Sequence, residues 1–244
     1  LRRVLLGSVK RGEVGLRFGV LFLQRASPLL RHGELPLQRL RLGVTGAVLT
    51  MQLGQLRAQA RHLSAQAGGA TQHALHGLLL PGGGDMDPAF YGQERIPACG
   101  EPNLLRDAAE PKLLQAFLAT DKPVLGIGRV IKVMNVVLGG TLYQDIKPFE
   151  HVPHNDHWAK VHTVTVRRGT LLSRLLGQDT VLVNSQHHQA ADRIAPELEI
   201  AALSEDGIVE ALEKPDAHFC LGVQWHPEWL SDADPAQQGL FGAF

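Results

Sequence analysis

The segment Pro123–Gly140, with the sequence "PVLGIGRVIKVMNVVLGG", decides the predicted fold. Its first part, Val124–Ile127, is a short apolar run of the kind found in buried strands. The residues after Gly128 are apolar on nearly every side, which predicts a deeply buried helix that ends at the two glycines. A buried strand that turns sharply into a helix is how many enzymes present a nucleophile above an α/β sheet. The turn residue, Gly128, has no side chain, so the segment is either an active-site turn without its reacting atom or a structural turn.

Strands are predicted on both sides of this segment. Leu78–Leu80 precedes it, and His162–Val166, Val181–Asn184, Glu197–Leu203, Ile208–Glu213 and Phe219–Gln224 follow it. Strands that alternate with helices in the middle of the chain, followed by a β-rich later part, are typical of an α/β fold. We expect a mostly parallel central sheet flanked by helices, with a β-rich C-terminal part.

The helical pattern before Pro123 carries Leu113, Leu114, Phe117 and Leu118, and we expect Asp107 to cap its first turn. Pro111 is then tolerable only near the start of that helix. In the first third of the chain, Val4–Val9 has the pattern of a strand and Gln52–Gln66 that of a helix. The stretch between them, Arg11–Thr50, shows no clean period.

Length and composition favour one domain, residues 1–244. The net charge is zero, but residues 1–84 carry 11 Lys and Arg against two acids. A basic segment that binds nucleic acid usually has interleaved aromatic residues, and few are present, so we expect no nucleic-acid partner. No apolar run approaches the length of about 18 residues that a membrane span needs, and no signal peptide is recognisable, so we expect a cytoplasmic protein without membrane contact. Cys99 and Cys220 lie too far apart to indicate a disulfide framework or a zinc site.

Three predicted strands end in glycine-rich or polar turns, in Leu78–Asp85, Val124–Arg129 and Phe219–Glu228. Because reactive groups collect at the carboxyl ends of strands in an open α/β sheet, these turns are expected to meet at one crevice. There, the glycines after Pro81 can aim backbone N–H groups at an oxyanion. His226 is a candidate general base, because the carboxylate of Glu228, two residues further on, can fix its tautomer.

The segment "VNSQHHQ", residues 183–189, offers a dense group of donors and acceptors suited to a polar ligand, although an ordinary hydrophilic loop explains it equally well. Four histidines raise the alternative of a metal site, namely His151, His154, His157 and His162. Their spacings do not fit a helical pair of metal ligands, and carboxylate or cysteine companions are sparse. We therefore expect no metal and no cofactor.

In this order, the segments resemble the class I glutamine amidotransferase-like superfamily, and within it the gamma-glutamyl-gamma-aminobutyrate hydrolase-like branch. The matching blocks are "LLLPGGGDMDPAFYG", "RDAAEPKLLQAFLATDKPVLGI", "MNVVLGGTLYQD", "VNSQHHQ", "EDGIVEALE" and "GVQWHPEW". They run collinearly from about Gly77 to Trp229, whereas residues 1–76 match poorly. The resemblance implies a flavodoxin-like sheet and a Cys-His-Glu triad that hydrolyses gamma-glutamyl amides.

Carried over to this sequence, the resemblance implies that His226 and Glu228 are the triad histidine and glutamate. It places the oxyanion hole at Gly83 and the amide of Arg129. Polar groups of the substrate would be held by Ser185, His187 and His188. The family pattern G-I-C-R-G-x-Q departs here at the nucleophile, which is Gly128, and also at Val130 and Lys132.

Two functions follow as hypotheses. In the first, the chain has the fold of a gamma-glutamyl amide hydrolase and is inactive or strongly impaired, because without a nucleophile at Gly128 only binding and electrostatic contributions to catalysis remain. In the second, it is a non-enzymatic binding or regulatory module for a glutamyl or amino-acid ligand. Activation of water by His226 without a covalent intermediate is physically allowed but has no electrophile to assist it. A damaged reading frame is a further explanation of the unusual first third. A small-molecule ligand and a homodimer are the expected partners.

Overall fold

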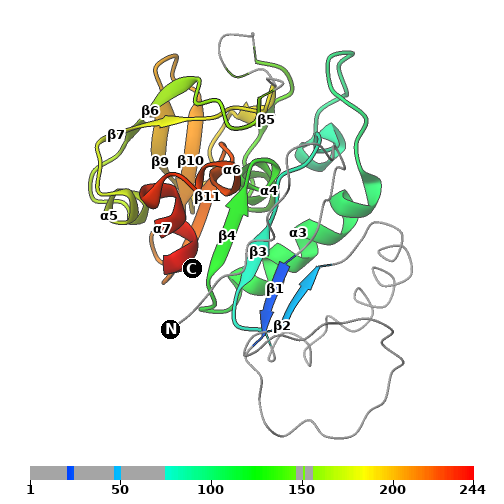
Figure 1. Cartoon of the computed structure of the whole chain (residues 1–244). Coiled ribbons are helices and arrows are strands. Elements are labelled where there is room, and N and C mark those ends of the chain that lie inside the picture. Colours follow the sequence, from blue (N-terminus) through cyan, green and yellow to red (C-terminus); the bar gives the residue numbers. More distant parts are fainter. Residues whose placement is uncertain (1–20, 25–46, 51–74, 147–150, 152–155) are drawn as a thin grey trace, which may run out of the picture.

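The computed structural model describes residues 21–24, 47–50, 75–146, 151 and 156–244, and in the first two ranges it describes the backbone strands only. The described part is built on a sheet of nine strands in the order β2-β1-β3-β4-β11-β10-β9-β6-β7 (Figure 1). The strands are β1 (Leu21–Gln24), β2 (Ala47–Thr50), β3 (Leu78–Leu80), β4 (Val124–Ile127), β6 (His162–Val166), β7 (Thr180–Val183), β9 (Glu199–Ser204), β10 (Val209–Glu213) and β11 (Cys220–Val223). A separate pair is formed by β5 (Leu142–Tyr143) and β8 (Ala190–Ala191).

The centre of the large sheet is parallel, and its flanks are antiparallel. β4 pairs in parallel with β3 on one side and with β11 on the other. Beyond β11, the strands β10, β9, β6 and β7 pair antiparallel, which is the β-rich C-terminal part predicted above. The predicted fold class is confirmed, because a parallel centre with flanking helices continues into this later part of the sheet (Figure 1).

Helices cover both faces of the sheet. α3 (Leu104–Leu118) and α4 (Arg129–Val137) pack into one apolar cluster, which contains Leu114, Phe117, Ile131 and Met134. α5 (Leu171–Leu176), α6 (Pro227–Leu230) and α7 (Pro235–Ala243) contribute to a second cluster. A short 3-10 helix, η1 (Pro88–Tyr91), follows the glycine turn after β3. Along β4, Val124 belongs to the first cluster and Leu125 to the second, as strand alternation requires.

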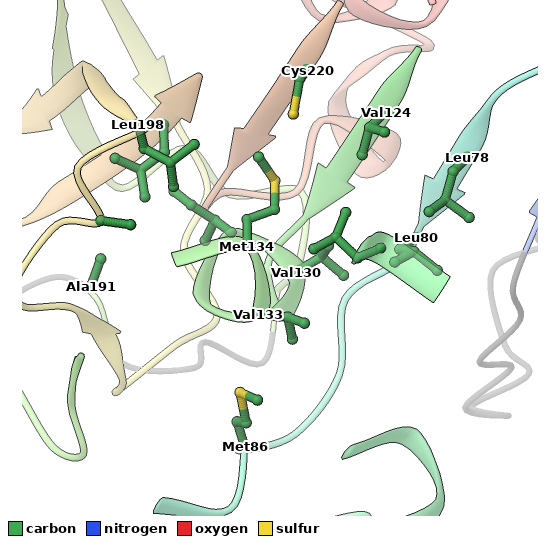
Figure 2. Packing of buried hydrophobic residues seen from close by; sticks show 14 of the residues in the cluster. Leu78, Leu80, Met86, Val124, Val130, Val133, Met134, Ala191, Leu198 and Cys220 are labelled. Atoms are coloured by element: carbon green, nitrogen blue, oxygen red, sulfur yellow. The ribbon is translucent and has the colours of Figure 1, made fainter. Parts of the chain in front are cut away.

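α4 packs on β4 and β11, with Val130 and Met134 turned toward these strands (Figure 2), and each of the two strands carries a glycine beneath the helix. A Cβ atom on Gly126 of β4 would lie 2.8 Å from the Val130 side chain. On Gly222 of β11 it would lie 3.1 Å from the Cα of Ile131. Residues 129–135 of the helix are all buried, so the prediction of a helix buried nearly all round is confirmed. This close approach fixes the turn at Gly128 relative to β11.

One local prediction is wrong. α3 begins at Leu104, and the side chain of Asn103, not that of Asp107, accepts the capping hydrogen bond, from the N–H of Arg106 at 3.2 Å. Asp107 lies in the first turn with its side chain fully buried, and Pro111 lies in the helix interior. Asparagine caps as well as aspartate does, so the capping rule could not choose between them. The predicted strand Val4–Val9 and helix Gln52–Gln66 lie outside the described residues.

Candidate functional site

The turn at Gly128 joins β4 to α4 in a backbone conformation that residues other than glycine rarely adopt. Its φ is 56° and its ψ is −105°, and its N–H donates to the Val223 carbonyl at 2.8 Å. A Cβ atom built on Gly128 would lie 3.0 Å from both Cε1 and Nε2 of His226 and 3.3 Å from the Cα of Gly82. A side chain at this position would therefore point directly at the imidazole of His226.

His226 lies at the end of β11 and pairs with Glu228 as predicted. Its Nδ1 lies 2.7 Å from Glu228 Oε1, and since a carboxylate accepts, Nδ1 carries the proton and Nε2 is left as the acceptor. The backbone is held by Asn184, whose Oδ1 accepts from the His226 N–H at 2.9 Å and whose Nδ2 donates to the His226 carbonyl at 3.1 Å. The ring is thereby fixed with its bare nitrogen toward Gly128.

The glycine turn after β3 also reaches this place, where Gly82 lies against the ring of His226. A Cβ on Gly82 would lie 2.5 Å from Cε1 of His226, so only glycine fits there. A Cβ on Gly83 would overlap the Arg106 guanidinium instead. Arg106 donates to the Gly82 carbonyl at 2.9 Å, and because the N–H and C=O of a trans peptide point in opposite directions, the Gly83 N–H points away from Arg106.

Arg129 is the first residue of α4, and its side chain holds the glycine turn from inside the protein. Its guanidinium is 1% exposed and donates to Glu110 at 2.9 Å, to Asp107, and to the carbonyls of Gly84 and Asp85. Burial alone would lower the pKa of Arg129, but the two carboxylates raise it above its ordinary value. Its backbone amide lies in the first turn of a helix, where N–H groups have no intrahelical acceptor.

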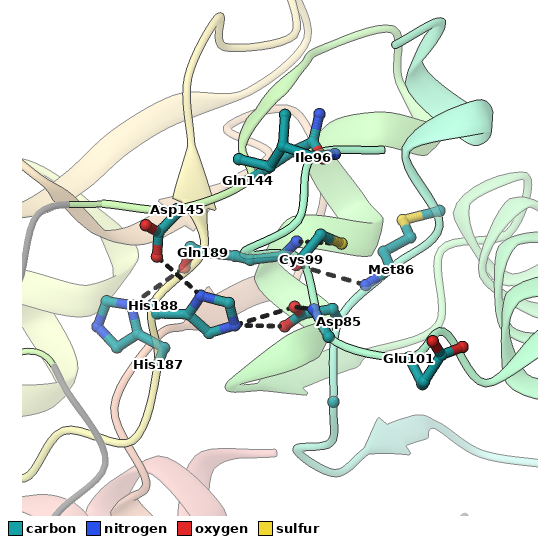
Figure 3. Close-up of polar contacts among 12 residues, drawn as sticks. Asp85, Met86, Ile96, Cys99, Glu101, Gln144, Asp145, His187, His188 and Gln189 are labelled. Carbon is teal, nitrogen blue, oxygen red and sulfur yellow. Dashed lines mark hydrogen bonds and ion pairs between the residues drawn. The ribbon is translucent and has the colours of Figure 1, made fainter. Parts of the chain in front are cut away.

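The three predicted substrate-binding residues go to two different places. His188 is partly exposed, and its ring bridges Asp85 at 2.9 Å and Asp145 at 3.1 Å (Figure 3). Ser185 and His187 are buried, with the Ser185 hydroxyl donating to the His151 carbonyl at 2.8 Å. In the described structure, only His188 of the three contacts the segment that follows the glycine turn, at Asp85.

Lys132 lies one helical turn beyond Gly128 and is 3% exposed. Burial lowers the pKa of its amine to about 8, although Asp85 and Glu210 act in the opposite direction. A buried amine on α4 is therefore within electrostatic range of Asp85 and Glu210, and its charged form is less favoured than in water.

Neither cysteine takes the place of a side chain at Gly128. Cys99 is buried and accepts a hydrogen bond from Gln189 at 3.5 Å (Figure 3), and burial followed by the Asp85 charge raises the pKa of its thiol. Cys220 begins β11, and burial raises the pKa of its thiol to about 12. Both thiols are thus protonated and inert at neutral pH, as expected for structural cysteines.

Sequence reasoning missed two parts of this region. Gly82 was not distinguished from its glycine neighbours, since only the fold shows which one faces His226. Glu210 was overlooked although it lies inside the apolar strand β10 with no exposure. An acid in the middle of a buried strand was the available signal, because such a group needs partners.

The model of the family described as Peptidase C26 matches residues 61–228. The chain belongs to the peptidase C26 family. Among its relatives, Protein NtpR of Enterococcus hirae is 42% identical over 174 residues, which cover 68% of this chain and 72% of that protein. Gamma-glutamyl-gamma-aminobutyrate hydrolase PuuD of Escherichia coli (strain K12) is 34% identical over 181 residues, or 70% of each chain.

A further relative and a solved structure are also similar to this chain. A Mycobacterium tuberculosis relative, provisionally named a glutamine amidotransferase, is 44% identical over 168 residues, covering 66% of this chain and 53% of that protein. The glutaminase domain of Trypanosoma brucei CTPS superposes with a TM-score of 0.51 at 17% identity, covering 79% of this chain and 77% of that one. At that identity the superposition shows the fold alone. None of the helices in the part of the chain that the structure describes is long and apolar enough to cross a membrane.

Proposed function

We propose that this chain keeps the ligand site of a gamma-glutamyl amide hydrolase and is catalytically inactive or strongly impaired. One observation carries the proposal: a side chain on Gly128 would point at Nε2 of His226 from 3.0 Å, at a turn that holds no nucleophile. Two contacts support the proposal: Glu228 Oε1 lies 2.7 Å from Nδ1 of His226, and Gly82 lies against the His226 ring. The similarity to a gamma-glutamyl-gamma-aminobutyrate hydrolase supports the substrate class.

The chemistry that a thiol would perform here can be written out. Nε2 of His226 would take the thiol proton, and the sulfur would attack the amide carbonyl carbon of the ligand. When the C–N bond breaks, His226 would return the proton to the leaving amine, and water would then hydrolyse the thioester. Without the sulfur, the first bond cannot form, although backbone N–H groups and His226 still surround the carbonyl.

The decisive experiment restores a thiol through Gly128→Cys. In the unaltered protein we expect gamma-glutamyl amide hydrolysis no more than about 10³–10⁴-fold above the uncatalysed rate. In Gly128→Cys we expect a thioester adduct with a gamma-glutamyl amide, detected by mass spectrometry of the intact protein after an acid quench. Its controls are Gly128→Ser and the double variant Gly128→Cys/His226→Ala, both without adduct.

Turnover by the unaltered protein at rates typical of enzymes, about 1–10³ s⁻¹, contradicts the proposal. The new side chain has a cost, because a non-glycine residue with φ near 56° is strained by about 1–3 kcal/mol and His226 must move by a few tenths of an ångström. Folding of each variant is therefore checked by circular dichroism before the chemistry is compared.

The second candidate function is a non-enzymatic module that binds a glutamyl or amino-acid ligand at the same crevice. The observation that favours it is the integrity of the surroundings of Gly128: Arg106 and Arg129 still hold the glycine turn through its carbonyls, and Asn184 still holds His226. Calorimetric titration with glutamine, glutamate and gamma-glutamyl amides tests it. Saturable binding abolished by Gly82→Val, whose side chain would collide with His226, supports this function, and no heat with any of the ligands contradicts it.

A further inference from the structure

A second cluster of polar side chains lies inside the later half of the sheet and has no part in the proposed hydrolysis. It consists of His151, His162 on β6, His187 in the loop after β7, and Glu210 on β10, all of them buried. One oxygen, Oε1 of Glu210, lies 3.4 Å from His151 Nδ1, 3.5 Å from His162 Nε2 and 3.3 Å from His187 Nε2. Three imidazoles therefore face a single buried carboxylate.

The hydrogens of two of these rings are committed elsewhere. Nδ1 of His187 lies 3.1 Å from the Gln189 carbonyl oxygen, which can only accept, so this nitrogen donates. Nε2 of His151 lies 3.0 Å from a carboxylate oxygen of Asp206 and donates to it for the same reason. In a neutral imidazole the other nitrogen then carries a lone pair. For both histidines this lone pair points at the Glu210 carboxylate. Because the imidazole nitrogen and the carboxylate oxygen are both hydrogen-bond acceptors, a cation is needed between them.

The polar atoms of the cluster also fail to bond to one another. Within the described residues, six atoms of this cluster are buried without a hydrogen-bond partner. They are His151 Nδ1, both ring nitrogens of His162, His187 Nε2 and both oxygens of Glu210. Buried polar groups normally have hydrogen-bond partners. Six neighbouring polar atoms without partners therefore indicate a ligand at their centre. Ligand atoms from His151, His162 and Glu210 all lie within 4.8 Å of one another.

The spacings suit a tetrahedral metal ion. Zinc binds imidazole nitrogen and carboxylate oxygen at about 2.0–2.2 Å, so two ligand atoms of a tetrahedron are about 3.3–3.6 Å apart. The three distances from Glu210 Oε1 to the facing nitrogens fall in that range or at its lower edge. A histidine that donates its second nitrogen to a carboxylate or a carbonyl, as His151 and His187 do, has the outer partner usual for a metal ligand.

We propose that His151, His162 and Glu210 bind a divalent transition-metal ion such as Zn²⁺. His187 faces the same carboxylate oxygen of Glu210 at 3.3 Å and borders this site. The carboxylates of Glu210 and Asp206 supply the two negative charges that balance the ion. The metal is structural: it joins β10 to β6 and His151, which lie far from β10 in the sequence. The expectation of no metal rested on the spacing of the histidines and on the scarcity of carboxylate companions near them in the sequence. Glu210 is a carboxylate companion that the fold brings to His151 and His162.

The test uses the full chain, stripped with a chelator and dialysed against Zn²⁺, with metal content measured by mass spectrometry and affinity by calorimetry. We expect about one Zn²⁺ per chain. Asp206→Asn, which keeps every ligand, should weaken Zn²⁺ binding about 10–100-fold by removing the outer partner of His151. His162→Gln should weaken it further, and the control His218→Gln, at an exposed histidine outside the cluster, should bind as the unaltered chain does.

Two results overturn the proposal. The first is that the unaltered chain binds no stoichiometric Zn²⁺. In that case protons on the histidines, and not a metal ion, balance the charge of the cluster. The other is equal Zn²⁺ affinity in Asp206→Asn, His218→Gln and the unaltered chain, which places the ion elsewhere. Because Asp206→Asn changes a partly exposed side chain, it remains a valid comparison if His162→Gln does not fold. The measurement needs no gamma-glutamyl ligand, so its outcome is independent of the function proposed for Gly128.

Discussion

At the scale of single residues, the crevice combines groups that fit a hydrolase with one that does not. His226 and Glu228 form the pair expected of a base and its orienting carboxylate. Lys132, by contrast, is an ammonium buried where its charged form is disfavoured. Functional sites often keep such unfavourable groups at a cost in stability, which makes the cost measurable.

Replacing Lys132 with glutamine should stabilise the folded chain at neutral pH. The pKa of this amine is about 8 when folded against 10.5 for an ordinary lysine, so between these values the unfolded chain binds more protons and stability rises with pH. Lys132→Gln removes this penalty. Its gain, on the order of 3 kcal/mol at pH values below about 8, should shrink as the pH rises toward about 10.

Urea denaturation across this pH range, with chelator present, measures the effect. Lys112→Gln is the matched control, because Lys112 is an exposed lysine on α3 and its replacement should change the stability little. A gain from Lys132→Gln that is constant across the range would mean that the buried amine is not the cause.

At the scale of elements, α4 and the two glycine-bearing strands beneath it form the support of the crevice. The strand, turn and helix at Pro123–Gly140 could be predicted from the sequence, because apolar runs indicate buried elements and glycines indicate turns within a short stretch of chain. The cluster around Glu210 was not, because its members lie at positions 151, 162, 187 and 210 and only the pairing of β6, β9 and β10 brings them together. The cap of α3 was misplaced because two equally suitable residues lie four positions apart.

Gly222→Ala should destabilise the protein by about 1–3 kcal/mol. The added methyl group would lie 3.0 Å from the Met134 sulfur and 3.1 Å from the Cα of Ile131, and the backbone atom cannot give way as a flexible side chain does. Thermal or urea unfolding measures the loss.

The matched variant is Gly239→Ala on α7, where the nearest atom, the Leu175 carbonyl oxygen, is 3.7 Å away. There the added methyl group finds space and favours the helix, so a gain of up to about 1 kcal/mol is expected. The same chemical change thus gives opposite signs at the two positions. A loss at Gly239 equal to that at Gly222 would show that tight packing against α4 is not the reason.

At the scale of the whole molecule, Arg129 connects three parts of the first half. It begins α4, pairs with Asp107 and Glu110 of α3, and holds two carbonyls of the segment after β3. Arg129→Met should cost about 3–5 kcal/mol, because the buried Asp107 loses its arginine partner and the buried Glu110 keeps only Arg106. Arg168→Met, which breaks the exposed pair with Asp179, should cost far less, because water screens that pair.

The shift in urea midpoint of each variant gives this comparison. Equal losses in the two arginine variants would contradict the central role of Arg129. Amide hydrogen exchange adds a local readout, since the segment after β3 should lose protection in Arg129→Met while β6 and β7, on the far side of the sheet, keep theirs.

The positive φ of Gly128 has a consequence for the ancestry of the chain. The glycine codons GGU and GGC differ from the cysteine codons UGU and UGC at a single base, so loss and recovery of a thiol at this turn are neighbouring genetic events. Because glycine alone occupies this conformation without strain, a glycine at this turn costs the backbone nothing, whereas a cysteine here must be maintained by selection.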